Sequence, residues 1–137
     1  MSKITQLLGS ALVLGCGFLL PMTAAAVDLG NGWSPSPLEL FNLPDYCQKQ
    51  FLSKNDPKVY QALSPGCDGI HHYCAGKVLL LRTTDYSIPA GERRRIFGQA
   101  KKEIGYMASR LTPSCSRLGD IRATEETMRM LEPQFKK

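Results

Sequence analysis

The stretch that decides the fold runs from residue 67 to residue 83 and reads CDGIHHYCAGKVLLLRT. From Ile70 to Thr83 the apolar side chains recur at helical spacing and occupy much of the circumference of the helix that they would form. A helix with so little polar surface is expected to be packed on two sides. We therefore expect residues 70–83 to be the central helix of the domain.

Three further helices are expected around this one. A short helix is predicted from Pro44 to Ser53, because proline suits a first turn, and residues 58–63 are expected to form only a turn. A third and longest helix follows Pro89, with the stripe Phe97, Ala100, Ile104, Met107, Ala108 and Leu111 on one face. Thr112 and Pro113 open a fourth helix, which runs to Leu131 and stops before Pro133.

No strand pattern competes with these helices, so the fold class predicted is all-α, a short antiparallel array of helical hairpins with about four helices. The helical domain spans 44–132. Residues 27–43, rich in proline and glycine, are expected to be an extended arm, and residues 133–137 a C-terminal tail.

The third helix resembles the second helix of a tetratricopeptide repeat (TPR), because Ala100, Ile104 and Met107 are followed by Thr112-Pro113. The central helix, with Tyr73, Gly76 and Leu80, is similar to the first helix of such a repeat, and Leu118-Gly119 would start the next one. The resemblance covers about one and a half units over residues 70–131, although the turn 83–92 is longer than in the family. The segments LPDYC (43–47) and HHYC (71–74) also resemble uncharacterised exported bacterial proteins with TPR-like repeats, a resemblance that implies no activity.

The cysteines predict two disulfides. Cys47, Cys67, Cys74 and Cys115 form an even set in a small domain, and the residues alone allow three pairings. The TPR-like stack implies that the N-terminal ends of the central and fourth helices lie side by side, so that Cys115 pairs with Cys67 or Cys74. The favoured set is Cys47 with Cys74 and Cys67 with Cys115.

Residues 1–26 have the layout of an export signal: the cation Lys3, an apolar stretch at 7–20, then Pro21 and small residues up to Ala26. Cleavage is expected after Ala26, which leaves a periplasmic or secreted protein. Val13-Leu14-Gly15-Cys16 loosely resembles a lipobox, so the alternative is a lipoprotein anchored through Cys16, the one case in which membrane association is expected.

The chain carries 17 basic and 12 acidic residues, a net charge of +5. An exported protein does not meet nucleic acid, so the excess favours anionic lipid, cell wall or an acidic protein partner, or serves solubility alone. Candidate partner-binding residues are Trp33 and the run Arg93, Arg94 and Arg95. The alternatives are that Trp33 anchors the arm on its own domain and that the arginines are the solvated start of a helix.

Residues 67–74 also place two thiols and both histidines together. Cys67, His71, His72 and Cys74 offer the donor types that bind zinc or copper. The spacing fits no standard zinc pattern, adjacent helical residues point about 100° apart, and an oxidised thiol is no ligand. The competing interpretation is a pair of structural histidines at the start of a helix.

Motifs for hydrolases, phosphate loops, zinc peptidases and reactive CxxC pairs are absent from the sequence, and no CxxCH indicates haem. We therefore expect no enzyme and no cofactor. The predicted function is a TPR-like adaptor of the bacterial envelope that binds a protein partner in the groove between the central and fourth helices. A periplasmic metal-binding protein that uses residues 67–74 is the alternative.

Overall fold

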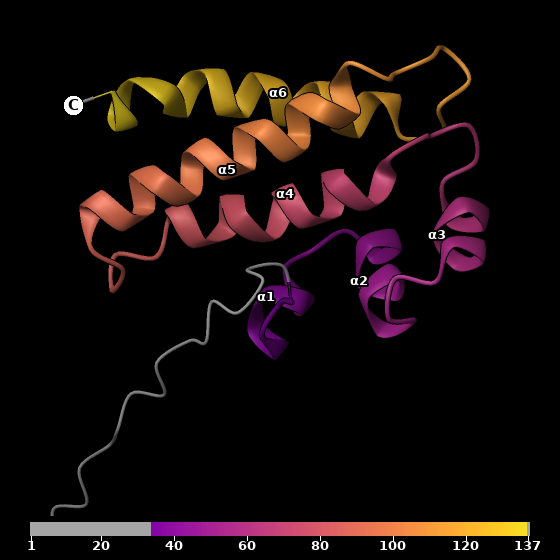
Figure 1. Cartoon of the computed structure of the whole chain (residues 1–137), viewed down its shortest axis with the longest axis horizontal. Coiled ribbons are helices and arrows are strands. Elements are labelled where there is room, and N and C mark those ends of the chain that lie inside the picture. The colour runs from indigo at the N-terminus through magenta and orange to yellow at the C-terminus, as the bar shows by residue number, and fades with distance from the viewer. Residues whose placement is uncertain (1–33, 137) are drawn as a thin grey trace, which may run out of the picture.

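The computed structural model describes residues 34–136, in which every regular element is helical (Figure 1). The elements are α1 (Pro37–Phe41), α2 (Asp45–Leu52), α3 (Pro57–Leu63), α4 (Ile70–Thr83), α5 (Ala90–Ala108), α6 (Leu118–Leu131) and the 3₁₀ helix η1 (Glu132–Phe135). Figure 1 shows α4, α5 and α6 as successive helices of alternating direction, with α1, α2 and α3 gathered beside α4. The all-α prediction is confirmed.

The described residues form six α-helices rather than about four, because two short ones start at proline. The expected arm contains α1, in which Ser36 and Glu39 cap each other's backbone amides and Pro37 occupies the first turn. The expected turn at 58–63 belongs to α3, where the Asp56 side chain accepts a hydrogen bond from the Lys58 amide. Both helices are too short to show a hydrophobic period.

The fourth predicted helix begins later than expected, at Leu118 rather than at Thr112. Residues 109–117 form a loop, because Cys115 is bonded to Cys67 and the Ser116 amide donates a hydrogen bond to the Pro65 carbonyl. At the other end, the expected tail 133–137 is helical as far as Phe135 in η1.

The core lies where α4 packs on α5. Gly76 makes this contact close, since a Cβ atom at that position would lie 2.5 Å from Cγ1 of Ile104. The predicted central helix is buried as expected, and α5 contributes a stripe on one face. The buried residues of α5 are Ile96, Phe97, Ala100, Ile104 and Met107.

Two disulfides join the outer elements to this core, in the favoured set. Cys47–Cys74 attaches α2 to α4, and neither residue has any exposed surface. Cys67–Cys115 joins the loop before α4 to the loop before α6, and both residues are buried. The predicted pairing is confirmed.

A buried polar contact fixes α6 against α4. The Tyr73 hydroxyl lies 2.9 Å from Oγ1 of Thr124, and the Tyr46 hydroxyl of α2 donates to a carboxylate oxygen of Asp120 at 3.1 Å. Burial raises the pKa of both tyrosines, so both remain protonated hydrogen-bond donors at neutral pH.

No helix within residues 34–136 combines the length and the apolar character needed to cross a bilayer. The expected signal at 1–26, its cleavage site after Ala26 and the alternative lipidation site at Cys16 all lie outside the described residues.

The disulfides generate the first prediction. Intact-mass measurement of the oxidised protein should show four hydrogens fewer than the reduced chain, because two bridges each remove two. Loop closure over 27 and 48 residues contributes about 3.5 and about 4 kcal/mol, so reduction should lower the melting temperature sharply. Labelling of any of these four cysteines in the denatured protein before a reductant is added would contradict the two bridges.

The helix contact generates a second prediction, with a built-in control. Gly76→Ala should destabilise the protein by about 1–3 kcal/mol, because the added methyl group overlaps Ile104. Gly98→Ala on α5 should instead raise stability by about 0.4–1 kcal/mol, since nothing lies within 4 Å of its new methyl group. Urea unfolding of both variants measures the difference, and equal effects would show that α4 and α5 are further apart than described.

Candidate functional site

The structure does not assemble the alternative metal ligands. Cys67 and Cys74 belong to different disulfides, so neither offers a thiolate in this state. Within residues 34–136, no group of three or more histidine, cysteine, aspartate or glutamate side chains is placed to hold a metal ion. His71 and His72 therefore have to be explained by their other neighbours.

The histidines belong to a series of tilted rings in contact, which ties α3 and α5 to the start of α4. Ring centroids are 5.2 Å apart between Tyr60 and His71, 4.3 Å between the two histidines, and 4.1 Å between His72 and Tyr106. The Arg110 guanidinium lies 4.4 Å above the far face of this arrangement, at Tyr106. Such contacts between tilted rings stabilise packing between helices.

The two histidines differ in their polar contacts. Nδ1 of His72 lies 2.7 Å from a carboxylate oxygen of Glu103, a contact that joins α4 to α5. Nδ1 of His71 is buried without a hydrogen-bond partner. Burial lowers the pKa of His71, and His72 lowers it further, while Asp68 and Glu103 act in the opposite direction. A neutral His71 ring therefore packs in the fold.

The three predicted partner-binding arginines have three different environments. Arg95 forms an ion pair with Glu92, one turn earlier on α5. Arg93 donates to the carbonyls of Ile88 and Thr83 and lies 4.6 Å over the Tyr86 ring. Arg94 is exposed and forms no hydrogen bond or ion pair with the residues described.

Arg93 and Arg94 line a hollow of about 200 Å³ at the end of the molecule where α4 turns into α5. Its other lining residues are Tyr86, Ala90, Gln134 and Phe135, and we call it the arginine hollow. Phe135 is fixed by stacking on Phe97 of the core, with centroids 4.4 Å apart. Tyr86 is 81% exposed. The hollow thus combines aromatic walls with guanidinium groups.

The acidic residues nearest to the arginine hollow already have partners. Asp85 accepts hydrogen bonds from the hydroxyl and the amide of Ser87, which lower the pKa of its carboxyl. Glu92 is held by Arg95, whose hydrogen bonds lower the pKa of the glutamate. No side chain caps the start of α5. An anion in the hollow would meet positive potential from the arginines and from the helix dipole.

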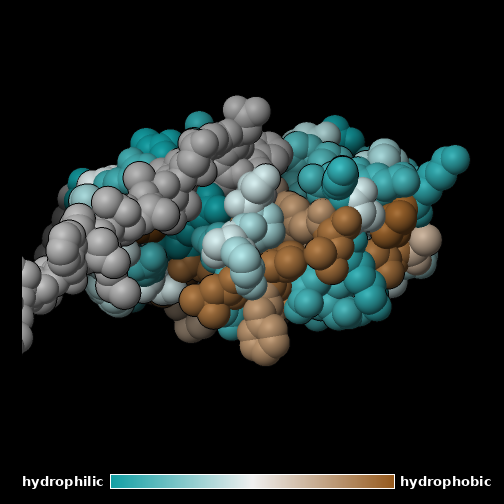
Figure 2. Space-filling model, turned by 90° about the horizontal axis from the view of Figure 1, so that it is seen from below, coloured by the Kyte–Doolittle hydropathy of each residue, from teal (hydrophilic) through white to brown (hydrophobic). Residues whose placement is uncertain are grey.

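A second exposed feature, on α1 and α2, was not expected from the sequence. Leu38, Phe41 and Leu52 are 73%, 79% and 70% exposed, and Figure 2 shows a band of hydrophobic residues on this side of the molecule. The segment 27–43 was expected to be extended, which gave these side chains no common face. The available signal was the capping pair Ser36 and Glu39, three residues apart.

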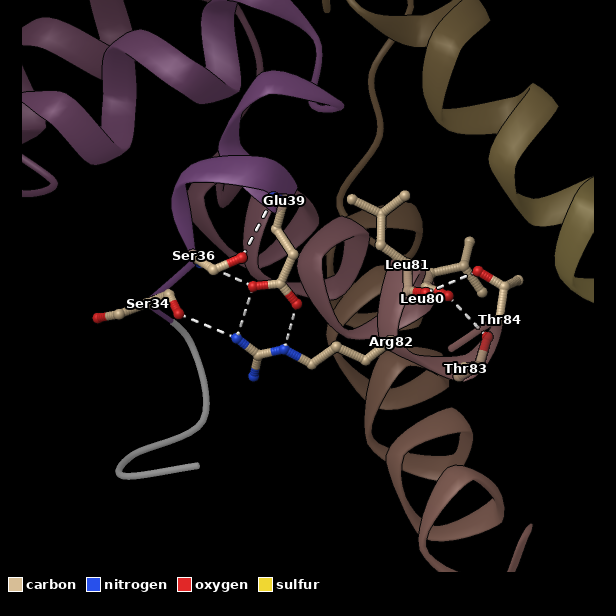
Figure 3. Close-up of polar contacts among 8 residues, drawn as sticks. All are labelled: Ser34, Ser36, Glu39, Leu80, Leu81, Arg82, Thr83 and Thr84. Carbon is tan, nitrogen blue, oxygen red and sulfur yellow. Dashed lines mark hydrogen bonds and ion pairs between the residues drawn. The ribbon is translucent and has the colours of Figure 1, made fainter. Parts of the chain in front are cut away.

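One buried arginine holds α1 in place (Figure 3). Arg82, only 5% exposed, donates from Nε to Glu39 at 2.6 Å and from Nη2 to the Ser34 carbonyl at 2.9 Å. Burial alone would raise the pKa of Glu39, but the hydrogen bond and charge of Arg82, with the Ser36 amide, outweigh it and lower the pKa. No residue of α1 is fully buried, and this ion pair orients the helix together with Leu40, which packs partly buried against the core.

The groove predicted between the central and fourth helices is filled. Tyr73 and Thr124 meet there through their hydroxyls, and Ile121 beside them has no exposed surface. A partner in the predicted groove would have to displace these core side chains. Trp33, the other predicted partner-binding residue, lies outside the described residues.

The burial of His71 predicts a pH dependence of stability. Its pKa is lower in the folded than in the unfolded chain, so the unfolded chain binds the proton first as the pH falls. The free energy of unfolding should therefore decrease below the ordinary histidine pKa of about 6.5 until the folded pKa is reached. His71→Phe keeps a ring beside Tyr60 and should remove this part of the slope in urea titrations between pH 7.5 and 5. An unchanged slope would contradict the assignment.

No protein-family model, no curated protein and no solved structure matches this chain. What the protein does has to be inferred from its own residues.

Proposed function

We propose that the protein is a small exported adaptor of the bacterial envelope, TPR-like and without catalytic activity, which binds an acidic segment of a protein partner. The observation that carries the proposal is the arginine hollow, in which Arg93 and Arg94 stand between the rings of Tyr86 and Phe135. The succession of α4, α5 and α6 in alternating directions supports the TPR-like interpretation, since such repeats stack helical hairpins against their neighbours.

The charges around the hollow favour a carboxylate. Arg94 forms no ion pair with a described residue and Glu92 is paired with Arg95, while Asp85, hydrogen-bonded to Ser87, stays charged and offsets part of the charge of Arg93. Arginine binds carboxylates through paired, charge-assisted hydrogen bonds, which give orientation as well as affinity. The backbone contacts of Arg93 leave its position fixed before a partner arrives.

The aromatic walls favour a protein over a free ion. Tyrosine, phenylalanine and arginine are enriched at protein interfaces, because they bury large areas and still offer polar contacts. Tyr86 is almost fully exposed beside Arg93, although a ring of that size gains by being covered. An extended acidic segment with a neighbouring apolar side chain would satisfy both the guanidinium groups and the rings.

Crosslinking in the envelope tests this proposal. A photoreactive phenylalanine analogue in place of Tyr86 should give a crosslinked product of one defined mass. Arg94→Glu should weaken that product about tenfold, because it places like charge against the partner. The matched control is Lys102→Glu, an exposed cation without an ion pair further along α5, which should leave the product unchanged.

Two results would count against the adaptor. One is a crosslinking pattern that Arg94→Glu and Lys102→Glu change equally, which would mean that net charge alone drives association. The other is crosslinking that persists in 1 M salt, because an exposed arginine–carboxylate contact should be screened there.

A further inference from the structure

We propose that the exposed apolar side chains of α1 and α2 dock on the surface of a bilayer that contains anionic lipid. Leu38, Phe41 and Leu52, named here the docking face, are each at least 70% exposed, whereas most large apolar residues of the described chain are buried or half-buried. Exposed apolar patches on small proteins mark places where another apolar phase is met.

The two helices are braced so that these side chains share one side. The Gln48 side chain of α2 donates to the Leu43 carbonyl at 2.8 Å and reaches the Phe41 carbonyl at 3.5 Å. Leu52 follows Gln48 by one helical turn and so lies on the same side of α2. Figure 2 views the molecule from the side on which α1 and α2 lie in Figure 1 and shows hydrophobic residues in a band there.

The shape of the docking face fits a bilayer better than a folded protein. Its side chains project from short helices, and α1 has no buried residue of its own. A protein partner would need pockets that match these projections, whereas the acyl region of a bilayer accepts them without a matching surface. Because α1 is only five residues long, only its individual apolar side chains, and not a whole helix face, would insert into the interface.

The ion pair of Arg82 lowers the cost of such docking. Short amphipathic segments usually have to fold on the membrane, which costs conformational entropy. Here α1 is already helical, because Arg82 holds Glu39 and the Ser34 carbonyl, and the Ser36–Glu39 capping pair closes its first turn. The apolar side chains are therefore presented in a fixed arrangement.

The cations next to Leu52 indicate anionic headgroups. Lys54 and Lys58 follow Leu52 in the chain, are exposed, and form no ion pair. Lys49 is paired with Asp45, and Asp56 caps α3, so neither carboxylate neutralises Lys54 or Lys58 through an ion pair. Lysines beside an apolar insertion increase affinity for anionic lipid in a salt-dependent way.

The inference uses none of the residues of the arginine hollow, so either proposal can fail while the other stands.

Vesicle flotation tests the docking face. The exported protein should float with vesicles of phosphatidylethanolamine and phosphatidylglycerol, and much less with phosphatidylcholine alone. Changing Leu38 and Phe41 together to serine should lower binding about tenfold. Leu52→Ser, on the other helix, should lower it as well. Met130→Ser, which removes an exposed apolar side chain from α6, should have no effect and is the matched control.

The role of Lys54 and Lys58 is tested by the salt dependence of vesicle binding. Changing Lys54 and Lys58 to glutamine should reduce binding to the anionic vesicles and flatten its dependence on salt. All variants share one N-terminus, so a retained signal or an acyl group at Cys16 would affect them equally. Circular dichroism and melting establish that each variant is folded, as expected for substitutions of exposed side chains.

Three outcomes would overturn the inference. The first is absence of binding to anionic vesicles by the unchanged protein. The second is an equal loss of vesicle binding from Met130→Ser, which would show that binding does not depend on α1 and α2 in particular. The third is a dimer in lipid-free solution that the Leu38 and Phe41 substitutions abolish, because the docking face would then bind a second copy of the chain.

Discussion

The close approach of α4 to α5 at Gly76 and Ile104 is the contact on which the rest of the structure depends. Without a side chain at residue 76, two helices can pack along most of their length and bury the apolar surface that a chain of this size has available. The other helices are too short or too polar to form a core by themselves. They are fixed to this pair by a few buried side chains and by one strong contact each: Cys47–Cys74 for α2, Arg82 for α1, and the Tyr73 hydroxyl for α6.

This arrangement explains which parts of the fold could be predicted. The central helix and the stripe of α5 repeat an apolar pattern over many residues, and such patterns are what sequence reasoning detects. Placing the starts of two helices at the same end left two possible partners for Cys115, and the favoured one, Cys67, is confirmed. Helix α1 could not be recognised by periodicity, because it has five residues, and its stability depends on an arginine 43 residues away from Glu39. Contacts of that kind have no local signature.

At the candidate site, too, the environment of each side chain depends on contacts that the local sequence does not show. Arg93, Arg94 and Arg95 are equivalent when read in sequence, yet successive helical positions point about 100° apart. Arg93 therefore contacts backbone carbonyls and Arg95 pairs with Glu92. Arg94 forms neither kind of contact with the described residues. His71 and His72 likewise suggested a ligand set with their neighbouring cysteines. Both cysteines are oxidised, to the different partners of the favoured set, so neither thiolate remains for that ligand set.

The two disulfides have a consequence for how the chain is made, because their loops interleave. Cys67 lies inside the loop closed by Cys47 and Cys74, and Cys74 lies inside the loop closed by Cys67 and Cys115. A chain that emerges amino end first presents Cys47 and Cys67 together, and these two are not partners. Oxidation in the order of emergence would join the wrong sulfurs. The native bridges therefore require either that oxidation waits until α4 has formed or that a wrong first bridge is exchanged by a thiol.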